Sequence, residues 1–182
     1  MRKPRQLKTG VEYHVVARAN RQEFILNNDE VKKILLDIIK RSKKKYKFSL
    51  RNFCIMSNHF HLIIKPKKKY ELSKIMQWIL SVFAVRFNRM YGLHGHVWYD
   101  RFKSQIISSF RQLYATFNYI QANPVIAKIV SNAEEYKFTG LNFITQNKTD
   151  IVDPPDFLTR LIVKKRLPEN YLLIANRELP DF

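Results

Sequence analysis

The sequence predicts a mixed α+β domain in which an antiparallel sheet carries helices on one face. Alternating, β-branched stretches that are typical of strands are interrupted by amphipathic stretches with apolar residues at helical spacing. Their order along the chain is strand, helix, two strands, helix, strand and a further helix, which is the split β-α-β arrangement of ferredoxin-like domains. The chain has 182 residues and is 46% hydrophobic, with four Gly and seven Pro. That composition supports one packed core and excludes a disordered or fibrous chain.

The first strand and the first helix are predicted within residues 13–45. Residues 13–19 alternate and are rich in β-forming side chains, which predicts a strand. Asn28 and Asp29 can cap the helix that follows, and the lysines at 43–45 suit the negative end of its dipole. Between these limits, apolar residues recur at helical spacing, at Val31, Ile34, Leu35, Ile38 and Ile39.

The middle of the chain predicts a hairpin and a second helix. Residues 48–56 and 59–65 are typical of two strands, joined at the short polar break Ser57-Asn58. The helix extends from residue 72 to about residue 90 and ends near Gly92, because glycine accepts the left-handed conformation of a C-terminal cap. Its apolar stripe is formed by Leu72, Ile75, Met76, Ile79 and Phe83.

A last strand, a third helix and a C-terminal extension complete the prediction. Residues 97–108 are typical of a strand that is bent or split, and residues 110–122 of a helix that Pro124 stops. We expect residues 1–144 to form the main domain, and residues 145–182 to form an extension, either an appendage packed on that domain or a flexible tail. The stripe of the third helix contains Leu113, Phe117 and Ile120.

The strongest compositional feature is positive charge. The chain has 33 Lys and Arg against 15 Asp and Glu, a net charge of +18. Residues 1–128 carry 26 of those basic residues and only 7 of the acidic ones. A nucleic acid is the best-fitting partner for this surface, since its phosphates attract it whatever the base sequence. An anionic membrane fits less well, because no segment combines a basic face with an exposed apolar one.

Cysteine usage and the apolar runs exclude several other classes. The single cysteine, Cys54, excludes an internal disulfide and every multi-cysteine zinc site. No apolar run approaches the roughly 20 residues that span a bilayer, and the basic residues 1–5 lead into no apolar signal core. We therefore expect a cytoplasmic protein, associated with the nucleoid when it is bound to DNA.

Two histidines of the hairpin form the first candidate site. On a strand, His59 and His61 project from the same face while Phe60 points into the core. Such a pair can grip one metal ion, with a further ligand supplied from elsewhere in the fold. The alternative is that both imidazoles only face solvent or satisfy hydrogen bonds.

Tyr119 and Asn123 form the second candidate site. They are four residues apart on the third helix, so their side chains lie on one stripe, at the margin of the buried face. Tyr119 can therefore lie in a cleft. The alternative is that Tyr119 is a packing residue at the boundary of the core and that Asn123 ends the helix before Pro124.

Together the two sites resemble a known family. The segment Ser57 to Ile64 is similar to the histidine–hydrophobic–histidine (HUH) signature of single-tyrosine transposases, and Tyr119 to Val125 is similar to their catalytic-tyrosine helix. A tyrosine followed four residues later by Asn-Pro-Val is typical of the REP-associated tyrosine transposase branch, whereas the insertion-sequence branch usually has glutamine there. Residues 95–98 and 101–104 are similar to a further segment of the REP-associated branch, and the resemblance covers about residues 11–144.

The resemblance implies a metal-dependent reaction on DNA. It implies that His59, His61 and Asn123 bind Mg²⁺ or Mn²⁺ and that Tyr119 attacks the scissile phosphate, which leaves a 5′-phosphotyrosine and a free 3′-OH. The implied partner is single-stranded DNA with hairpin or palindromic ends, which the protein cleaves and rejoins. We expect three further residues to contact this DNA: Trp98, Arg101 and Lys103.

The resemblance also implies an oligomeric state and has departures. Asn123 favours a monomer, as in the REP-associated branch, over the dimer of the insertion-sequence branch. This chain has Ala127-Lys128 and Thr139-Gly140 where the branch commonly has other residues, which affects the expected DNA contacts more than the chemistry. Two alternatives remain open: a non-catalytic, domesticated nucleic-acid-binding module, and a hydrolytic metal nuclease that uses water as its nucleophile. No metalloprotease or deaminase signature is present.

Overall fold

The computed structural model describes residue 8 and residues 10–164. Its centre is a four-stranded antiparallel sheet in the order β2-β3-β1-β4. Strand β3 lies between β1 and β2, so α1 connects two strands that are not neighbours, as the split β-α-β arrangement requires. The predicted α+β, ferredoxin-like fold is confirmed. The strands span Glu12–Arg18 (β1), Phe48–Ile55 (β2), His59–Pro66 (β3) and Lys103–Ile107 (β4).

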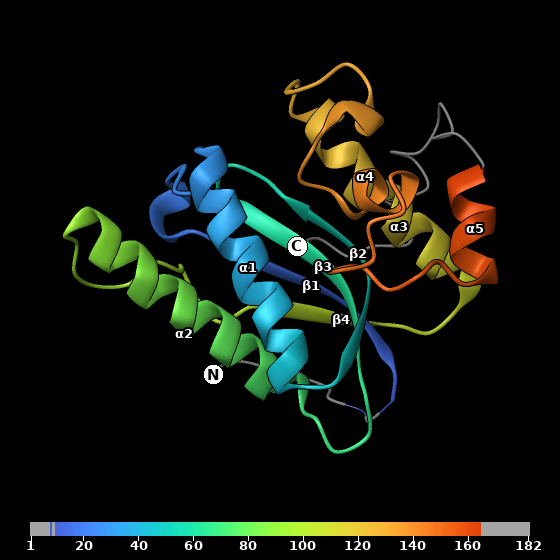
Figure 1. Ribbon diagram of the computed structural model, residues 1–182, viewed down its shortest axis with the longest axis horizontal. Coiled ribbons are helices and arrows are strands. Elements are labelled where there is room, and N and C mark those ends of the chain that lie inside the picture. The colour runs from blue at the N-terminus through green and yellow to red at the C-terminus, as the bar shows by residue number, and fades with distance from the viewer. Residues whose placement is uncertain (1–7, 9, 165–182) are drawn as a thin grey trace.

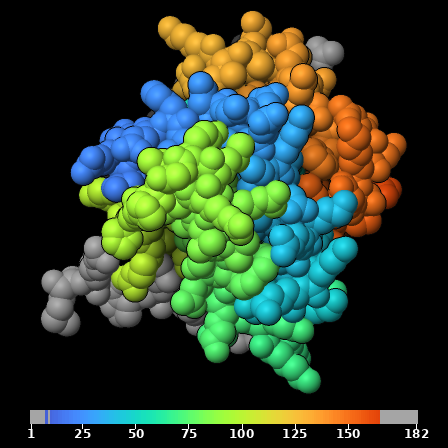
Figure 2. All heavy atoms as spheres, turned by 60° about the vertical axis from the view of Figure 1, so that its left-hand side comes forward, coloured from blue at the N-terminus to red at the C-terminus, as the bar shows by residue number. Residues whose placement is uncertain are grey.

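Five helices surround the sheet. Helices α1 and α2 lie side by side over one face, whereas α3, α4 and α5 gather on the other side of the molecule (Figure 1), and the space-filling view also shows α1 and α2 in contact (Figure 2). None of the described helices is both long and apolar enough to cross a membrane. The helices span Asp29–Lys45 (α1), Leu72–Tyr91 (α2), Phe110–Ile126 (α3), Gly140–Thr145 (α4) and Phe157–Lys164 (α5).

The register of the sheet divides its side chains between two faces. Val16 of β1 pairs with His61 of β3 on one side and with Lys103 of β4 on the other. Since neighbouring residues of a strand point to opposite faces, these three side chains share the face away from α1 and α2. The opposite face is apolar: the ring of Phe60 lies 5.5 Å from that of Trp98, which in turn packs 5.1 Å from the ring of Phe83 on α2.

The ends of α1 and α2 follow the predicted signals. The side chain of Asn28 caps α1 by accepting a 2.7 Å hydrogen bond from the backbone N–H of Glu30, so Asn28 and not Asp29 is the cap. The lysines at 43–45 occupy the last turn. Helix α2 ends at Gly92, which has a φ of 61°. That left-handed conformation is the reason for a glycine there.

Two predictions about β4 and α3 have different outcomes. The stretch 97–108 is split, as expected: Trp98 forms an isolated bridge with Ala19, and β4 begins only at Lys103. The prediction that Pro124 stops the third helix is wrong, because α3 continues to Ile126. The missing N–H of proline falls in the last turn, so the helix loses one hydrogen bond without being broken.

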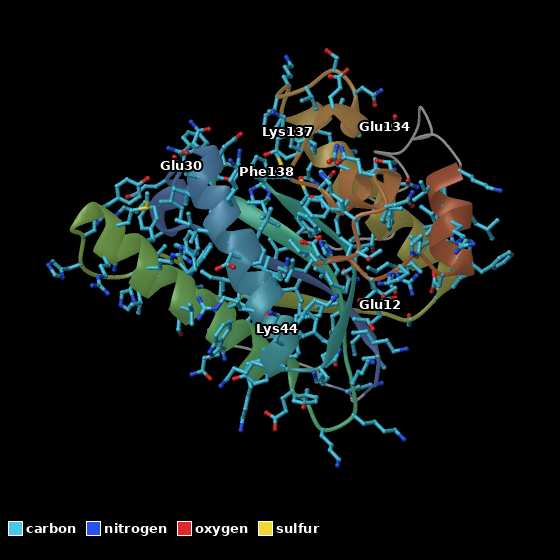
Figure 3. All side chains as sticks on the ribbon, in the orientation of Figure 1. Glu12, Glu30, Lys44, Glu134, Lys137 and Phe138 are labelled. Atoms are coloured by element: carbon cyan, nitrogen blue, oxygen red, sulfur yellow. The ribbon has the colours of Figure 1, made fainter. Side chains whose placement is uncertain are left out.

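The segment between α3 and α4 returns to the edge strand β2. The backbone N–H of Ile55 donates to the carbonyl of Phe138 at 3.0 Å, and the hydroxyl of Tyr136 donates to the carbonyl of Ile55 at 2.7 Å. Phe138 lies beside the N-terminal part of α1 (Figure 3), where the Lys32 ammonium is 4.9 Å from its ring centroid. A buried cation is thus placed over an aromatic face, which partly replaces its lost hydration.

The described part of the C-terminal extension packs on the sheet edge. Asp153 accepts a 2.5 Å hydrogen bond from the backbone N–H of Leu50, and Arg51 pairs with Asp156 at 2.6 Å just before α5. Ile162 of α5 is fully buried. Residues 145–164 are therefore a packed appendage, whereas 165–182 lie outside the described residues. The division of the chain at residue 144 stays a prediction.

Candidate functional site

The structure brings His59, His61 and Tyr119 together. Alternation on β3 places both imidazoles on the same face of the sheet, with ring centroids 4.9 Å apart. Helix α3 crosses that face and places the phenol ring of Tyr119 5.6 Å from the ring of His61, nearly perpendicular to it. His61 is buried and Tyr119 is half-buried. Two residues that are 58 or more positions from Tyr119 in the sequence thus form one cluster with it.

Asn123 joins the cluster from the next turn of α3. Its amide Nδ2 donates a 2.6 Å hydrogen bond to the backbone carbonyl of Tyr119, one turn earlier. Its side chain also forms hydrogen bonds with His59 and with the Tyr119 phenol that affect the pKa of each group. All four residues that the sequence singled out for metal binding and nucleophilic attack are therefore neighbours in space.

Burial sets the protonation of the cluster. Burial, followed by the charge of Arg18, lowers the pKa of His59 to about 4, against the opposing effect of its hydrogen bond with Asn123. Burial, and then the neighbouring His14, His59 and Arg18, hold the pKa of His61 well below its usual value. Both imidazoles are therefore neutral at pH 7, which is the form that binds a metal ion.

The phenol of Tyr119 needs activation. Burial raises its pKa above the ordinary value of 10.0, while the charge of Arg18 and the hydrogen bond with Asn123 lower it. The group therefore carries its proton at pH 7. A protonated phenol is a weak nucleophile, so attack at neutral pH requires that the proton leave as the new bond forms.

His59 and His61 each have the Nδ1 atom engaged by a neighbouring side chain. His59 Nδ1 lies 2.7 Å from Asn58 Oδ1, and His61 Nδ1 lies 3.0 Å from His14 Nε2. His61 Nε2 is buried and makes no hydrogen bond to a described residue. Metal-binding histidines in proteins commonly have this pattern, with one nitrogen held by the protein and the other left for the ion.

These residues fit a divalent metal as a mixed set of ligands. In the described part of the chain, no group of three or more His, Cys, Asp or Glu side chains could hold a metal ion. A metal here would depend on two imidazoles and the Asn123 amide. Such a set provides two imidazole nitrogens and one amide oxygen and leaves positions for phosphate and water oxygens, the ligands that Mg²⁺ and Mn²⁺ prefer.

Of the three residues expected to contact DNA, Arg101 and Lys103 lie near the cluster, whereas Trp98 packs on the opposite face of the sheet. Lys103 begins β4 and Arg101 precedes it, and both are exposed. They line a pocket of about 430 Å³ next to the cluster. Trp98 is half-buried, and its indole N–H donates to the carbonyl of Leu80 at 3.0 Å. That bond anchors Trp98 in the core, and DNA contact by its ring stays a prediction.

For His14 on the first strand, the sequence allowed a place near the site but favoured an ordinary structural role. It lies in the middle of β1, is fully buried, and packs its ring against that of His61 with centroids 5.2 Å apart. Alternation within the strand 13–19 places His14 and Val16 on one face and Val15 on the other, but alternation does not show which face meets the histidines of β3. The register between β1 and β3 supplies that information.

A strand-borne histidine pair beside a single tyrosine on a crossing helix defines the class of HUH single-tyrosine transposases. Within that class the chain belongs to the IS200-like transposase family, whose model matches residues 8–123. This stretch contains the whole cluster from His14 to Asn123. The family establishes transposase function for the chain.

One solved structure supports the fold. The chain is similar to the "REP associates tyrosine transposase bound to a REP hairpin", at 20% identity and a TM-score of 0.69, over 80% of this chain and 86% of that one. It also matches a "putative transposase from Deinococcus radiodurans R1", at 18% identity and a TM-score of 0.48, over 70% of this chain and 97% of that one. No curated protein matches the sequence.

Proposed function

We propose that the protein is a metal-dependent transposase that cleaves and rejoins single-stranded DNA at hairpin or palindromic ends through a covalent 5′-phosphotyrosine. The observation that carries the proposal is the convergence of Tyr119 with two neutral imidazoles whose Nδ1 atoms are already engaged. Membership of the IS200-like family supports a DNA substrate, and the solved relative bound to a REP hairpin supports a hairpin one.

In this mechanism the chain's residues position and activate the phosphate. His59, His61 and Asn123 would hold the ion, and a bound Mg²⁺ or Mn²⁺ polarises the scissile phosphate and offsets its developing charge. The Tyr119 oxygen attacks phosphorus and loses its proton, while the bond from phosphorus to the 3′ oxygen breaks and that oxygen takes up a proton. The energy of the broken bond is kept in the phosphotyrosine, so attack by a 3′-OH can rejoin the strand.

The monomer is the proposed working unit, on the ground of the Asn123 match to the REP-associated branch. Helix α3 packs against the sheet of its own chain and brings Tyr119 to that chain's histidines. A dimer with exchanged tyrosine helices is the other possibility. Light scattering coupled to size-exclusion chromatography in the presence of hairpin DNA distinguishes a 21.8 kDa chain from its dimer.

The test is formation of a covalent adduct. Protein incubated with Mn²⁺ and a single-stranded hairpin oligonucleotide, taken from palindromes that flank the coding region, should give a species of raised mass on a denaturing gel. Tyr119→Phe should give none. Tyr114→Phe, on the same helix and also half-buried, is the matched control and should react as the wild type does.

The alternatives predict different products. A non-catalytic binding module gives salt-dependent binding without an adduct. A hydrolytic nuclease releases free 5′-phosphate ends and is indifferent to Tyr119→Phe. If Tyr119→Phe yields as much adduct as the wild type, Tyr119 is not the nucleophile.

A further inference from the structure

A pocket adjoins the catalytic cluster and presents cations around an exposed aromatic ring. Its volume is about 430 Å³. Its wall includes Val16, the residue that pairs directly with His61 across β1 and β3. Tyr99 lies at the pocket with 71% of its side chain exposed, far more than packing would leave. The basic residues of the wall are Arg18, Arg21, Arg101 and Lys103.

The position of Arg18 connects this pocket to the cluster. Arg18 pairs with His59 in the register between β1 and β3, and its charge acts on His59, His61 and Tyr119. A phosphate held between the two histidines and Tyr119 would therefore lie near Arg18. In a DNA strand that carries this phosphate, the adjacent nucleotide would lie within reach of the pocket.

The composition of the pocket fits a nucleotide. Cations around a groove attract the phosphate backbone, while an exposed aromatic ring offers a stacking surface to any base. The one carboxylate of the wall, Asp100, is engaged locally, since its Oδ1 accepts a 2.6 Å hydrogen bond from the backbone N–H of Arg101. Four cations against one carboxylate leave the pocket positive.

We propose that this pocket binds the nucleotide next to the scissile phosphate, with the base stacked on Tyr99 and the phosphate among Arg18, Arg101 and Lys103. The inference rests on the proposed function, which supplies single-stranded DNA as the substrate. It adds a base-stacking subsite beside the catalytic groups, centred on Tyr99, which takes no part in the chemistry.

The test uses binding without cleavage. All variants are made in the Tyr119→Phe protein, and affinity is measured by fluorescence anisotropy with a labelled oligothymidylate of about eight nucleotides. Tyr99→Ala should bind about 5- to 100-fold more weakly, and Tyr99→Phe should keep the affinity because it keeps the ring. Phe157→Ala removes an aromatic ring of similar exposure (73%) on α5 and should have no effect.

A cross-link gives a second readout. An oligonucleotide that contains 5-iododeoxyuridine is irradiated while it is bound to the protein. Sequencing of the cross-linked peptides should place the attachment at Tyr99. If Tyr99→Ala binds as tightly as its parent and the cross-link falls elsewhere, the pocket is not the subsite. This outcome is separate from the proposed function, because wild-type adduct formation is scored without reference to Tyr99.

An independent observation concerns His14. The 3.0 Å contact between His14 Nε2 and His61 Nδ1 joins two buried imidazole rings. One nitrogen must donate and the other must accept. If His61 Nδ1 donates, its Nε2 carries a lone pair and can bind a metal; if His14 donates, the proton of His61 is on Nε2, which cannot bind one.

We infer that His14 is a positioning residue that accepts the hydrogen bond from His61 Nδ1–H and so keeps His61 Nε2 available as a ligand. The inference rests on the proposed metal site. Groups that orient a metal-binding histidine in this way commonly change metal affinity by about 10- to 100-fold when they are removed.

The test is metal affinity in the absence of DNA. Calorimetric titration of metal-free protein with Mn²⁺ should show about 10- to 100-fold weaker binding for His14→Leu, and affinity within a few-fold of wild type for His14→Gln, whose amide oxygen can accept the same hydrogen bond. Nitrogen NMR of wild-type His61 should show the proton on Nδ1. A proton on Nε2, or a Gln variant as weak as the Leu variant, would overturn the inference, and the NMR result stands even if His14→Leu fails to fold.

Discussion

Gly140 gives the sharpest prediction about stability, because the structure leaves no room for a side chain there. It begins α4, which packs on β2. A Cβ atom at this position would meet Asn52 Oδ1, and would lie 2.9 Å from the backbone nitrogen of Phe53 and 3.0 Å from the Asn52 Cα. The last two atoms belong to a paired strand and cannot move without displacing it.

We therefore expect Gly140→Ser to lower the free energy of unfolding by about 1–3 kcal/mol, the usual cost of overpacking a well-packed site. For a chain of this size, each kcal/mol corresponds to a fall in Tm of about 2–4 °C. Urea denaturation measures the change as a lower midpoint at constant slope. A Gly140→Ser protein as stable as the wild type would refute this account of the packing.

A double-mutant cycle with Asn52→Ala tests which atoms oppose the new side chain. Asn52 Oδ1 accepts a 2.8 Å hydrogen bond from the backbone N–H of Phe53, so Asn52→Ala has a cost of its own, which the cycle subtracts. With Oδ1 absent, Gly140→Ser should lower the free energy of unfolding by at least about 0.5 kcal/mol less than it does in the wild type. The rest of its cost should persist, since the backbone atoms of β2 remain.

The same packing explains one departure from the family pattern. Thr139-Gly140 stands where related transposases commonly have two serines, and the sequence suggested an effect on DNA contacts. In the structure Thr139 is buried, forms an isolated bridge with Cys54 and caps α4. The pair is accounted for by contact with β2, because only a glycine allows α4 to approach the strand so closely.

Three further predictions concern the site. Burial lowers the pKa of His14 to about 3, so below the unfolded value of about 6.5 only the unfolded chain gains a proton there. Between pH 6 and pH 4, in EDTA, the free energy of unfolding should fall more steeply with decreasing pH in the wild type than in His14→Gln. The two slopes should differ by up to about 1.4 kcal/mol per pH unit, and equal slopes would contradict this account. Free Mn²⁺ at about 100 times Kd should raise the unfolding free energy by about 2.7 kcal/mol, measured by thermal melting, and His61→Ala should abolish the rise. Lys103→Ala should reduce the slope of log affinity for single-stranded DNA against log salt by about one, whereas Lys44→Ala on α1 serves as the control.

The sequence predicted which residues of the cluster share a face better than it predicted the irregular parts of the fold, and the roles of those residues stay predictions. Period-two alternation was enough to place His59 and His61 on one face, and four-residue spacing was enough to align Tyr119 with Asn123. Neither pattern states that α3 crosses the face of the sheet that carries the histidines. The resemblance to a family supplied that contact, and the structure confirms it through the 5.6 Å separation of the His61 and Tyr119 rings.

The features that the sequence did not predict depend on tertiary contacts. Helix α4 has six residues and exists because Gly140 fits against Asn52 and Thr139 caps it, and its composition carries no helical period. Pro124 lies inside α3, buried in its last turn, where a missing N–H costs the helix one hydrogen bond without breaking it. Local propensity gave the wrong end for this helix, since packing outweighs it in the last turn.

The positive charge near the site also helps to keep the histidines neutral. A surface basic enough to attract DNA also disfavours protonated imidazoles: the charge of Arg18 adds to burial in lowering the pKa of both His59 and His61. Neutral imidazoles are what a metal ion requires, and the same guanidinium lines the pocket beside them. One side chain of β1 thus favours the ligand form of the histidines and attracts the phosphate that they would help to bind. Arg18→Gln should therefore weaken DNA binding and raise the pKa of His59 together, two changes that a purely structural arginine would not link.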